Sequence, residues 1–253
     1  MSTALDSPLV VFAVSLVVQW LSAYLGYFLR RERQSLSKDA HDDFDTVQTA
    51  SLTLLALIIG FSFSMAVTRY DQRKNYEEAE ANAIGTEYLR ADLLPVEDAA
   101  RVRELLKGYL DQRISFYQDR EERQVSQIDS DTAKLQVELW SSVFGAADQR
   151  PTAVVALAVS GMNDVLNSQG YTQAAWWNRI PIAAWGLMGL MAICSNLLLG
   201  YGERRRSMLL LLVLPVIISI AFLLIADIDS PRGGIIRVHP HNLIALSQSI
   251  KVR

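Results

Sequence analysis

Apolar and polar stretches alternate on a long scale along this 253-residue chain. Four apolar stretches are each about as long as a bilayer is thick when coiled as a helix, which takes about 20 residues. They cover residues 8–29, 50–68, 180–200 and 207–226. Period-two alternation and turn dipeptides are scarce, so strands are not expected. The pattern predicts an all-α membrane protein with four transmembrane helices.

The second apolar stretch has no helix-breaking residue where it ends. From Arg69 to Leu94 there is no proline, and Gly85 is the only glycine. Most of these residues are strong helix formers. We therefore expect one long helix that leaves the membrane and continues into water as far as Pro95.

Residues 69–180 are predicted to form a helical extramembrane domain inserted between spans 2 and 3. Apolar residues recur with a helical period over 96–127, 131–149 and 152–168. The last of these is apolar but short, and we interpret it as a helix of the domain and not as a span.

Helix ends and connections are predicted from turn residues. Asp129–Asp131 is expected to be a turn, and Gly170 to end a helix. Residues 34–48 are expected to form a polar loop between the first two spans. His41 stands there among Asp42, Asp43 and Asp45, an arrangement that favours a solvated acidic loop over a cation site because calcium-loop spacing is missing.

The polar tail, residues 227–253, is expected to stay out of the membrane. Its stretch 243–250 is predicted to be a short helix that docks on the domain. His239 and His241 flank a proline in this tail, and exposure is the simpler interpretation than a metal site.

One face of the second span carries a distinctive set of side chains, which we call the stripe. Its members recur at spacings of three and four residues: Thr49, Thr53, Leu57, Gly60, Phe61, Ser64 and Thr68. Small and hydroxylated residues allow close contact between helices in lipid. The same pattern suits a pore lining in which Leu57 and Phe61 form an apolar constriction. Spacing alone favours the helix contact.

Composition limits the classes of function. The net charge of −3 gives no electrostatic reason to expect a nucleic-acid partner. The single cysteine, Cys194, excludes an intrachain disulfide and a cysteine metal cluster. Phosphate-loop, zinc-protease and nucleophile-elbow motifs are missing from the sequence. Glu80 and Glu87 are interpreted as partners in surface ion pairs with Lys74 or Arg90 and not as a catalytic carboxylate pair. We expect no enzyme activity, no metal and no cofactor.

Four stretches resemble bestrophin channels or their bacterial relatives. GFSFSMAVTRY, from Gly60 to Tyr70, is similar to the end of their second membrane helix. The phrase EANAIGTEYLRADLLP, ending at Pro95, resembles more specifically a bacterial bestrophin-like family described as a domain of unknown function. Residues 178–181 resemble the Ile-Pro start of the third span, and residues 229–233 the turn after the fourth. The motif residues are Gly60, Arg69, Tyr70, Pro181, Pro231 and Gly233.

The resemblance implies a homopentamer whose second spans surround a pore for inorganic ions. The implied pore and constriction residues are Thr53, Leu57, Phe61, Ser64 and Thr68. Thr53 departs from the apolar residue that bestrophin necks have at that level. Arg232 and Gly234 stand where eukaryotic relatives have an acidic calcium clasp, so calcium activation is not expected.

The expected location is a bacterial inner membrane, with several passes through the lipid bilayer. Short basic loops after spans 1 and 3 favour a domain outside the cytosol by the positive-inside rule. The resemblance implies a cytosolic domain, and this is the orientation we expect. The function expected is an ion channel, and the alternative is a non-conducting scaffold or sensor whose domain binds a protein partner.

Overall fold

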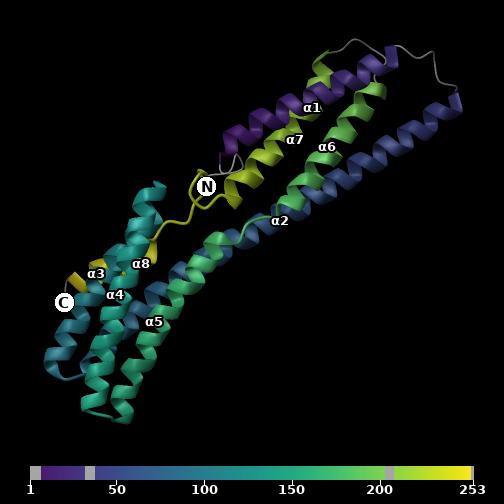
Figure 1. The fold of residues 1–253 in the computed structure, drawn as a ribbon. Helices are drawn as coiled ribbons and strands as arrows, with labels where there is room; N and C mark the ends of the chain where they lie inside the picture. Colours follow the sequence, from purple (N-terminus) through teal and green to yellow (C-terminus); the bar gives the residue numbers. More distant parts are fainter. Residues whose placement is uncertain (1–6, 32–37, 203–207, 252–253) are drawn as a thin grey trace. The chain divides into compact units, whose positions relative to one another are not determined.

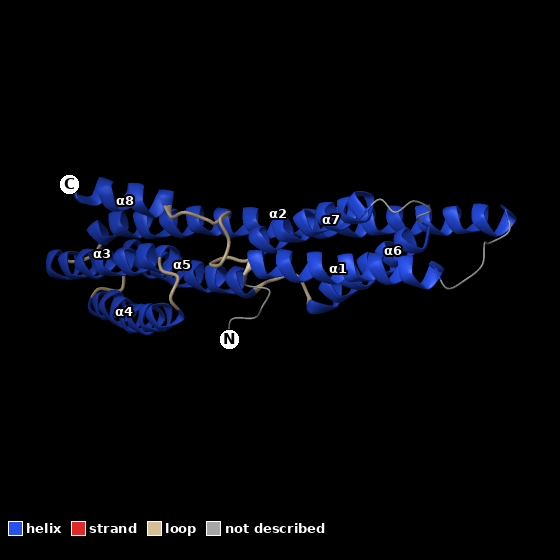
Figure 2. Cartoon of the chain, turned by 90° about the horizontal axis from the view of Figure 1, so that it is seen from above, coloured by secondary structure: helices blue, strands red, loops and turns tan. Residues whose placement is uncertain are grey.

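The structure, a computed structural model, describes residues 7–31, 38–202 and 208–251, and every regular element in these ranges is helical (Figures 1 and 2). In chain order the elements are α1 (Pro8–Arg31), α2 (Lys38–Arg90), the short 3₁₀ turn η2 (Ala91–Leu93), α3 (Val96–Gln118), α4 (Glu122–Gln149), α5 (Ala153–Trp177), α6 (Ile182–Gly202), α7 (Met208–Asp229) and α8 (His241–Lys251).

The chain divides into two compact units. Met1–Tyr70 and Arg179–Arg237 form the first unit, and Asp71–Asn178 and Val238–Arg253 form the second. Within the described residues, four regions are long and apolar enough to cross a membrane: Pro8–Arg30, Asp43–Leu93, Ala153–Gly202 and Leu211–Asp229. The prediction of an all-helical protein with four membrane spans is confirmed.

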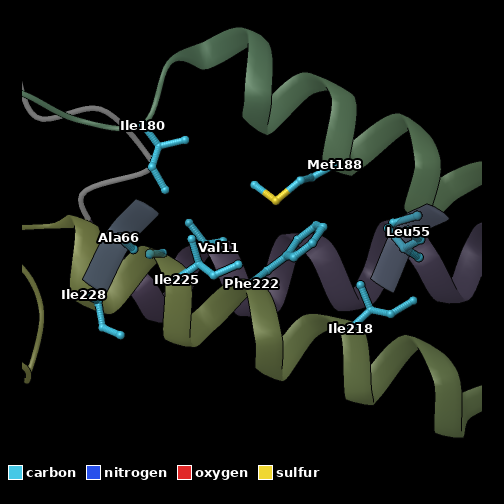
Figure 3. Close-up of a cluster of buried hydrophobic side chains, with 11 residues drawn as sticks. Val11, Leu55, Ala66, Ile180, Met188, Ile218, Phe222, Ile225 and Ile228 are labelled. Atoms are coloured by element: carbon cyan, nitrogen blue, oxygen red, sulfur yellow. The ribbon is translucent and has the colours of Figure 1, made fainter. Parts of the chain in front are cut away.

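The first unit packs α1, α6, α7 and the first part of α2 around one apolar core (Figure 3). Met188 of α6 points toward Phe222 and Ile225 of α7, and Leu55 of α2 lies at one end of the cluster. These side chains are almost fully buried. Aliphatic and aromatic residues at helical spacing thus hold four sequence-distant segments together.

Two glycines allow α1 and α6 to approach through their backbones. A Cβ atom on Gly26 would overlap the carbonyl oxygen of Leu197, and one on Gly200 would overlap that of Ala23. Small residues at such crossings are the usual means of close helix packing in lipid.

A buried polar bridge lies in the same unit. The Gln19 amide of α1 donates to Ser219 Oγ of α7 at 3.3 Å, and Asn196 Nδ2 of α6 donates to Gln19 Oε1 at 3.1 Å. In hydrocarbon these amides have no water to bond, so the bridge fixes which faces of the three helices meet.

Helix α2 is one continuous element of 53 residues. It ends at Arg90, and η2 carries the chain to the extended residue Leu94 before Pro95, as predicted. Its start differs from the prediction, because the helix begins at Lys38 and the expected polar loop 34–48 is mostly helical. The side chains of His41 and Asp42 lie outside the described residues.

The second unit contains α3, α4, α5, α8 and the rest of α2. The prediction that one helix covers residues 96–127 is wrong, since α3 ends at Gln118 and α4 begins at Glu122. Asp129–Asp131 is therefore no turn but a part of α4. Gly170 does not end a helix either, because α5 continues to Trp177. The short tail helix is confirmed as α8.

Candidate functional site

The stripe on α2 packs against no other helix among the described residues. All seven of its members are exposed, with Leu57 at 51% and Phe61 at 64%. Apart from its neighbours in α2, no described residue lies within 4 Å of the position that a Cβ on Gly60 would take. The face with small and hydroxylated residues is thus available to lipid, to water or to another protein surface.

The opposite face of the same helix is packed against the other helices of the first unit. Leu55, Ser62 and Ala66 are at most 5% exposed, and Leu55 and Ala66 belong to the apolar core. Ser51 and Ser195 share a hydrogen bond between their hydroxyl oxygens at 2.8 Å. Packing therefore fixes the rotation of α2 about its axis and so determines which side the stripe faces.

Hydroxyl groups of the stripe bond to the helix itself. Thr53 Oγ1 donates to the carbonyl oxygen of Thr49 at 2.8 Å, and Thr68 Oγ1 donates to that of Ser64 at 2.9 Å. Each of these carbonyl oxygens also accepts the backbone hydrogen bond of the helix. The threonine oxygen, which donates here, can still accept a hydrogen bond from water. The arrangement is compatible both with a wet lining and with a packed contact.

The motif residues at the end of the stripe meet around one carboxylate, that of Asp229. Its two oxygens accept from the backbone N–H of Ile180 at 3.1 and 3.2 Å, and Arg69 Nη1 lies 4.0 Å from Oδ1. Pro181, the next residue, accepts with its carbonyl oxygen from the first turn of α6. Three stretches of the sequence are thus joined where α2 passes out of the first unit.

The turn after α7 is closed by two more side chains. Asp227 accepts from the backbone N–H groups of Ile235 and Ile236 at 2.7 and 2.8 Å, and Ser230 Oγ accepts from Gly233 at 3.1 Å. A Cβ on Gly234 would overlap the carbonyl oxygen of Asp227. Pro231 is buried in this turn. The acidic residues here act as backbone acceptors and hold the turn together.

In the second unit the buried face of α2 carries charges. Arg73, Glu77, Glu80 and Glu87 are at most 2% exposed. They occupy the same face as Ile84 and Ala91, at spacings of three and four residues. The interpretation of Glu80 and Glu87 as surface residues is therefore wrong.

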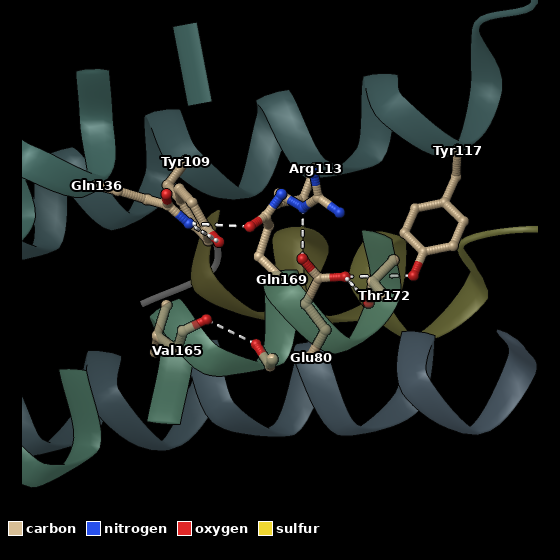
Figure 4. Close-up of polar contacts among 9 residues, drawn as sticks. Glu80, Tyr109, Arg113, Tyr117, Gln136, Val165, Gln169 and Thr172 are labelled. Atoms are coloured by element: carbon tan, nitrogen blue, oxygen red, sulfur yellow. Dashed lines mark hydrogen bonds and ion pairs between the residues drawn. The ribbon is translucent and has the colours of Figure 1, made fainter. Parts of the chain in front are cut away.

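Glu80 is the centre of a buried polar network (Figure 4). Arg113 Nε of α3 donates to Glu80 Oε1, and Tyr117 and Thr172 donate their hydroxyls to Oε2 at 3.2 and 3.1 Å. The guanidinium also lies over the Phe116 ring, 4.4 Å from its centroid. One carboxylate thus links α2, α3 and α5.

The network fixes the protonation state of Arg113 and of Tyr117. Burial works against the charge on Arg113, but the Glu80 carboxylate outweighs it and raises the arginine pKa, so the guanidinium stays charged. Burial and then the charge of Glu80 raise the pKa of the Tyr117 hydroxyl, which keeps it a donor. The pair Glu80–Arg113 is an internal ion pair with neutral donors around it.

Glu77 holds the tail helix in place. The backbone N–H groups of Asn242 and Leu243 donate to Glu77 Oε1 at 2.9 and 3.0 Å, and the Asn242 side chain donates to Oε2 at 2.6 Å. A carboxylate at a helix N-terminus satisfies free N–H groups and complements the helix dipole. His239 and His241 nearby are exposed, with ring centroids 5.8 Å apart.

A signal for the buried charges was present in the sequence. Arg73, Glu77, Glu80, Ile84, Glu87 and Ala91 follow the 4-3-4-3-4 spacing of a core-facing seam. Their charge masked that spacing, because glutamate and arginine are almost never fully buried unless they are paired.

Most of the chain matches a known family in sequence and solved structures in fold. The Bestrophin-like domain profile matches residues 10–243. A bacterial bestrophin homologue from Klebsiella pneumoniae is similar in structure, with a TM-score of 0.62, 15% identity, and 95% and 94% of the two chains covered. A variant of that homologue gives 0.61 at 15% identity, covering 94% and 96%. A membrane protein crystallised as a glycine-to-alanine variant gives 0.64 at 15% identity, covering 94% and 95%.

Among curated protein sequences none matches. At such low identity the structural likeness establishes the fold, whereas the match over residues 10–243 establishes the family. This chain, a multi-pass helical membrane protein, belongs to the bestrophin-like family.

Proposed function

We propose that the protein is a homo-oligomeric ion channel, a pentamer whose second spans surround the conducting path, and that it is not an enzyme. The observation that carries this proposal is the unpartnered stripe on α2. One face of this span packs against the other helices, and the opposite face is exposed and carries small and hydroxylated side chains. Such a helix is suited to a position around a central axis.

In this arrangement Leu57 and Phe61 narrow the path, and Thr53, Ser64 and Thr68 offer oxygen atoms above and below them. Both apolar side chains are more than half exposed in the single chain. Rings of such side chains control permeation because water leaves a narrow apolar constriction readily. We place the protein in a bacterial inner membrane, with the helical domain on the cytosolic side.

The first measurement is the oligomeric state of the purified full chain in detergent, by native mass spectrometry. Conductance is then recorded in planar bilayers. Phe61→Ala is expected to increase the unit current, because it removes a ring from the constriction. Phe63→Ala is the matched control, since residue 63 lies about 200° further around the helix. A monomer, or equal currents for both variants, contradicts the pore assignment.

Thiol labelling gives an independent test of what the stripe faces. In a Cys194→Ser background, Ser64→Cys is expected to react with a water-soluble thiol reagent in membranes. Ser62→Cys, on the packed face, is the control and is expected to stay unreactive, since Ser62 is 5% exposed. An unreactive Ser64→Cys contradicts a wet path.

A second candidate function is a non-conducting scaffold or sensor that binds a protein through its helical domain. It is favoured by Val137, Trp140 and Phe144, which are 68%, 39% and 56% exposed at helical spacing on α4. An apolar row on a water-facing helix suits a partner surface. Pull-down with the wild-type chain and with Trp140→Ser tests this alternative. A protein that the wild-type chain retains and Trp140→Ser loses, together with absent currents, supports it.

A further inference from the structure

One carboxyl group in the second unit has neither solvent nor a hydrogen-bond partner. Glu87 of α2 is 0% exposed, and neither of its oxygens has a hydrogen-bond partner among the described residues. Buried carboxylates normally accept two or more bonds, as Glu77 and Glu80 do on the same face. An ionised Glu87 in this place is therefore costly.

Glu87 lies in close contact with α5, and its side chain is not exposed to solvent. A Cβ on Gly161 of α5 would overlap Glu87 Oε2 and Arg90 Nη1. The carboxyl thus lies directly against the backbone of α5, in space that only a glycine leaves open. Helices α2 and α5 meet at this point.

The charged groups around Glu87 come from both helices. Arg90, one turn further along α2, lies beside it and is 4.0 Å from Asp164 of α5. Arg103 of α3 is engaged elsewhere, with Asp92 and the backbone oxygen of Tyr88. Arg90 is thus shared between two acids, of which Asp164 is 64% exposed and Glu87 is buried.

We infer that Glu87 is a proton-binding site that controls the packing of α2 against α5: the neutral carboxyl fits against Gly161, and ionisation of the carboxyl weakens that contact. This inference does not depend on conduction, and it concerns the second unit alone.

The direction and range of the pH response follow from the environment. Burial raises the pKa of the Glu87 carboxyl from 4.5 to about 8; Arg90 opposes the shift and Asp164 adds to it. The folded form thus binds more protons than the unfolded form between these values. The contact is fully stable below about pH 4.5, weakens as the pH rises, and stops changing above about pH 8.

Hydrogen exchange of the full chain in detergent, corrected for the intrinsic rate, tests the inference over residues 153–165. Between pH 6 and 9 the opened population in the wild type is expected to rise by roughly a hundredfold. Glu87→Gln and Glu87→Met, which have no proton to lose, are expected to show no such rise. Glu78→Gln, at an exposed position of α2, is the control and is expected to behave as the wild type.

Asp164→Asn adds a test that a purely structural role of Glu87 does not predict. It removes a charge that raises the Glu87 pKa, so the midpoint of the pH response is expected at a lower pH. A wild-type response that is flat, or that persists in both Glu87 variants, overturns the inference. So does an Asp164→Asn midpoint that stays the same or moves upward.

Discussion

Removal of the Glu80 charge should destabilise the second unit strongly, because it leaves Arg113 buried without its counter-charge. Both side chains are 0% exposed, and Nη1 and Nη2 of Arg113 have no hydrogen-bond partner among the described residues. Breaking a buried pair from one side costs about 3–5 kcal/mol. Glu80→Gln keeps an oxygen for Tyr117 and Thr172, so what it removes is the charged partner of Arg113.

The expected loss for Glu80→Gln is about 3 kcal/mol, which is an increase of more than roughly a hundredfold in the opened population. Glu80→Ala also leaves the two hydroxyls without an acceptor, at about 1–3 kcal/mol each, so its loss should be larger. The loss expected for Glu80→Ala is close to the whole free energy of unfolding of an ordinary domain.

Thermal unfolding of the full chain in detergent, followed by circular dichroism, measures the loss, and hydrogen exchange over residues 105–120 locates it in the second unit. Glu78→Gln is the surface control and should stay within about 0.5 kcal/mol of the wild type. The double variant Glu80→Gln/Arg113→Met should recover most of the loss, because it removes the unpaired guanidinium and keeps an oxygen for Tyr117 and Thr172. A Glu80→Gln loss below about 1 kcal/mol would refute the reasoning.

Three further changes test other contacts. Glu77→Ala should release α8, which loses three hydrogen bonds, and raise exchange over residues 241–251 at least tenfold; unchanged exchange argues against the carboxylate cap. Gly200→Val should force α1 away from α6 at Ala23 and lower the midpoint of thermal unfolding by several degrees, whereas Gly186→Val, in open space, should not. Asp229→Ala should cost about 2 kcal/mol, because the buried Ile180 N–H loses its acceptor; Asp229→Asn, which keeps an oxygen, should cost less in the same melting experiment.

The membrane part of the fold was predictable because lipid imposes a simple rule on the sequence. Apolar runs of bilayer length had to be helices, since the backbone has no other partner in hydrocarbon. The continuity of α2 was predictable for a local reason, the lack of a breaker before Pro95. The helix ends inside the domain were harder. The break at residues 119–121 contains no glycine or proline, so nothing local distinguishes it from helix.

The candidate site was predictable only in part. The stripe was visible because its small and hydroxylated residues are unusual in a span. The buried charges of α2 were not, because their partners Arg113, Thr172 and Asn242 lie far away in the sequence, and only the tertiary structure brings them to one face. A glutamate can be buried only where the fold supplies a partner for its charge, and a single sequence does not identify that partner.

The crossing of α1 and α6 has a consequence for how the chain is made. The Ser22 hydroxyl of α1 donates to the carbonyl oxygen of Ile193, which is 171 residues further along. At about 5–20 residues per second, a ribosome delivers α6 roughly 10–30 s after α1 has entered the bilayer. Throughout that interval Gln19 and the Gly26 surface face lipid without their partner helix. A chain whose synthesis stops before α6 therefore keeps a first helix in the membrane whose polar groups have no partner. The packing of α1 is completed only after α6 has been translated.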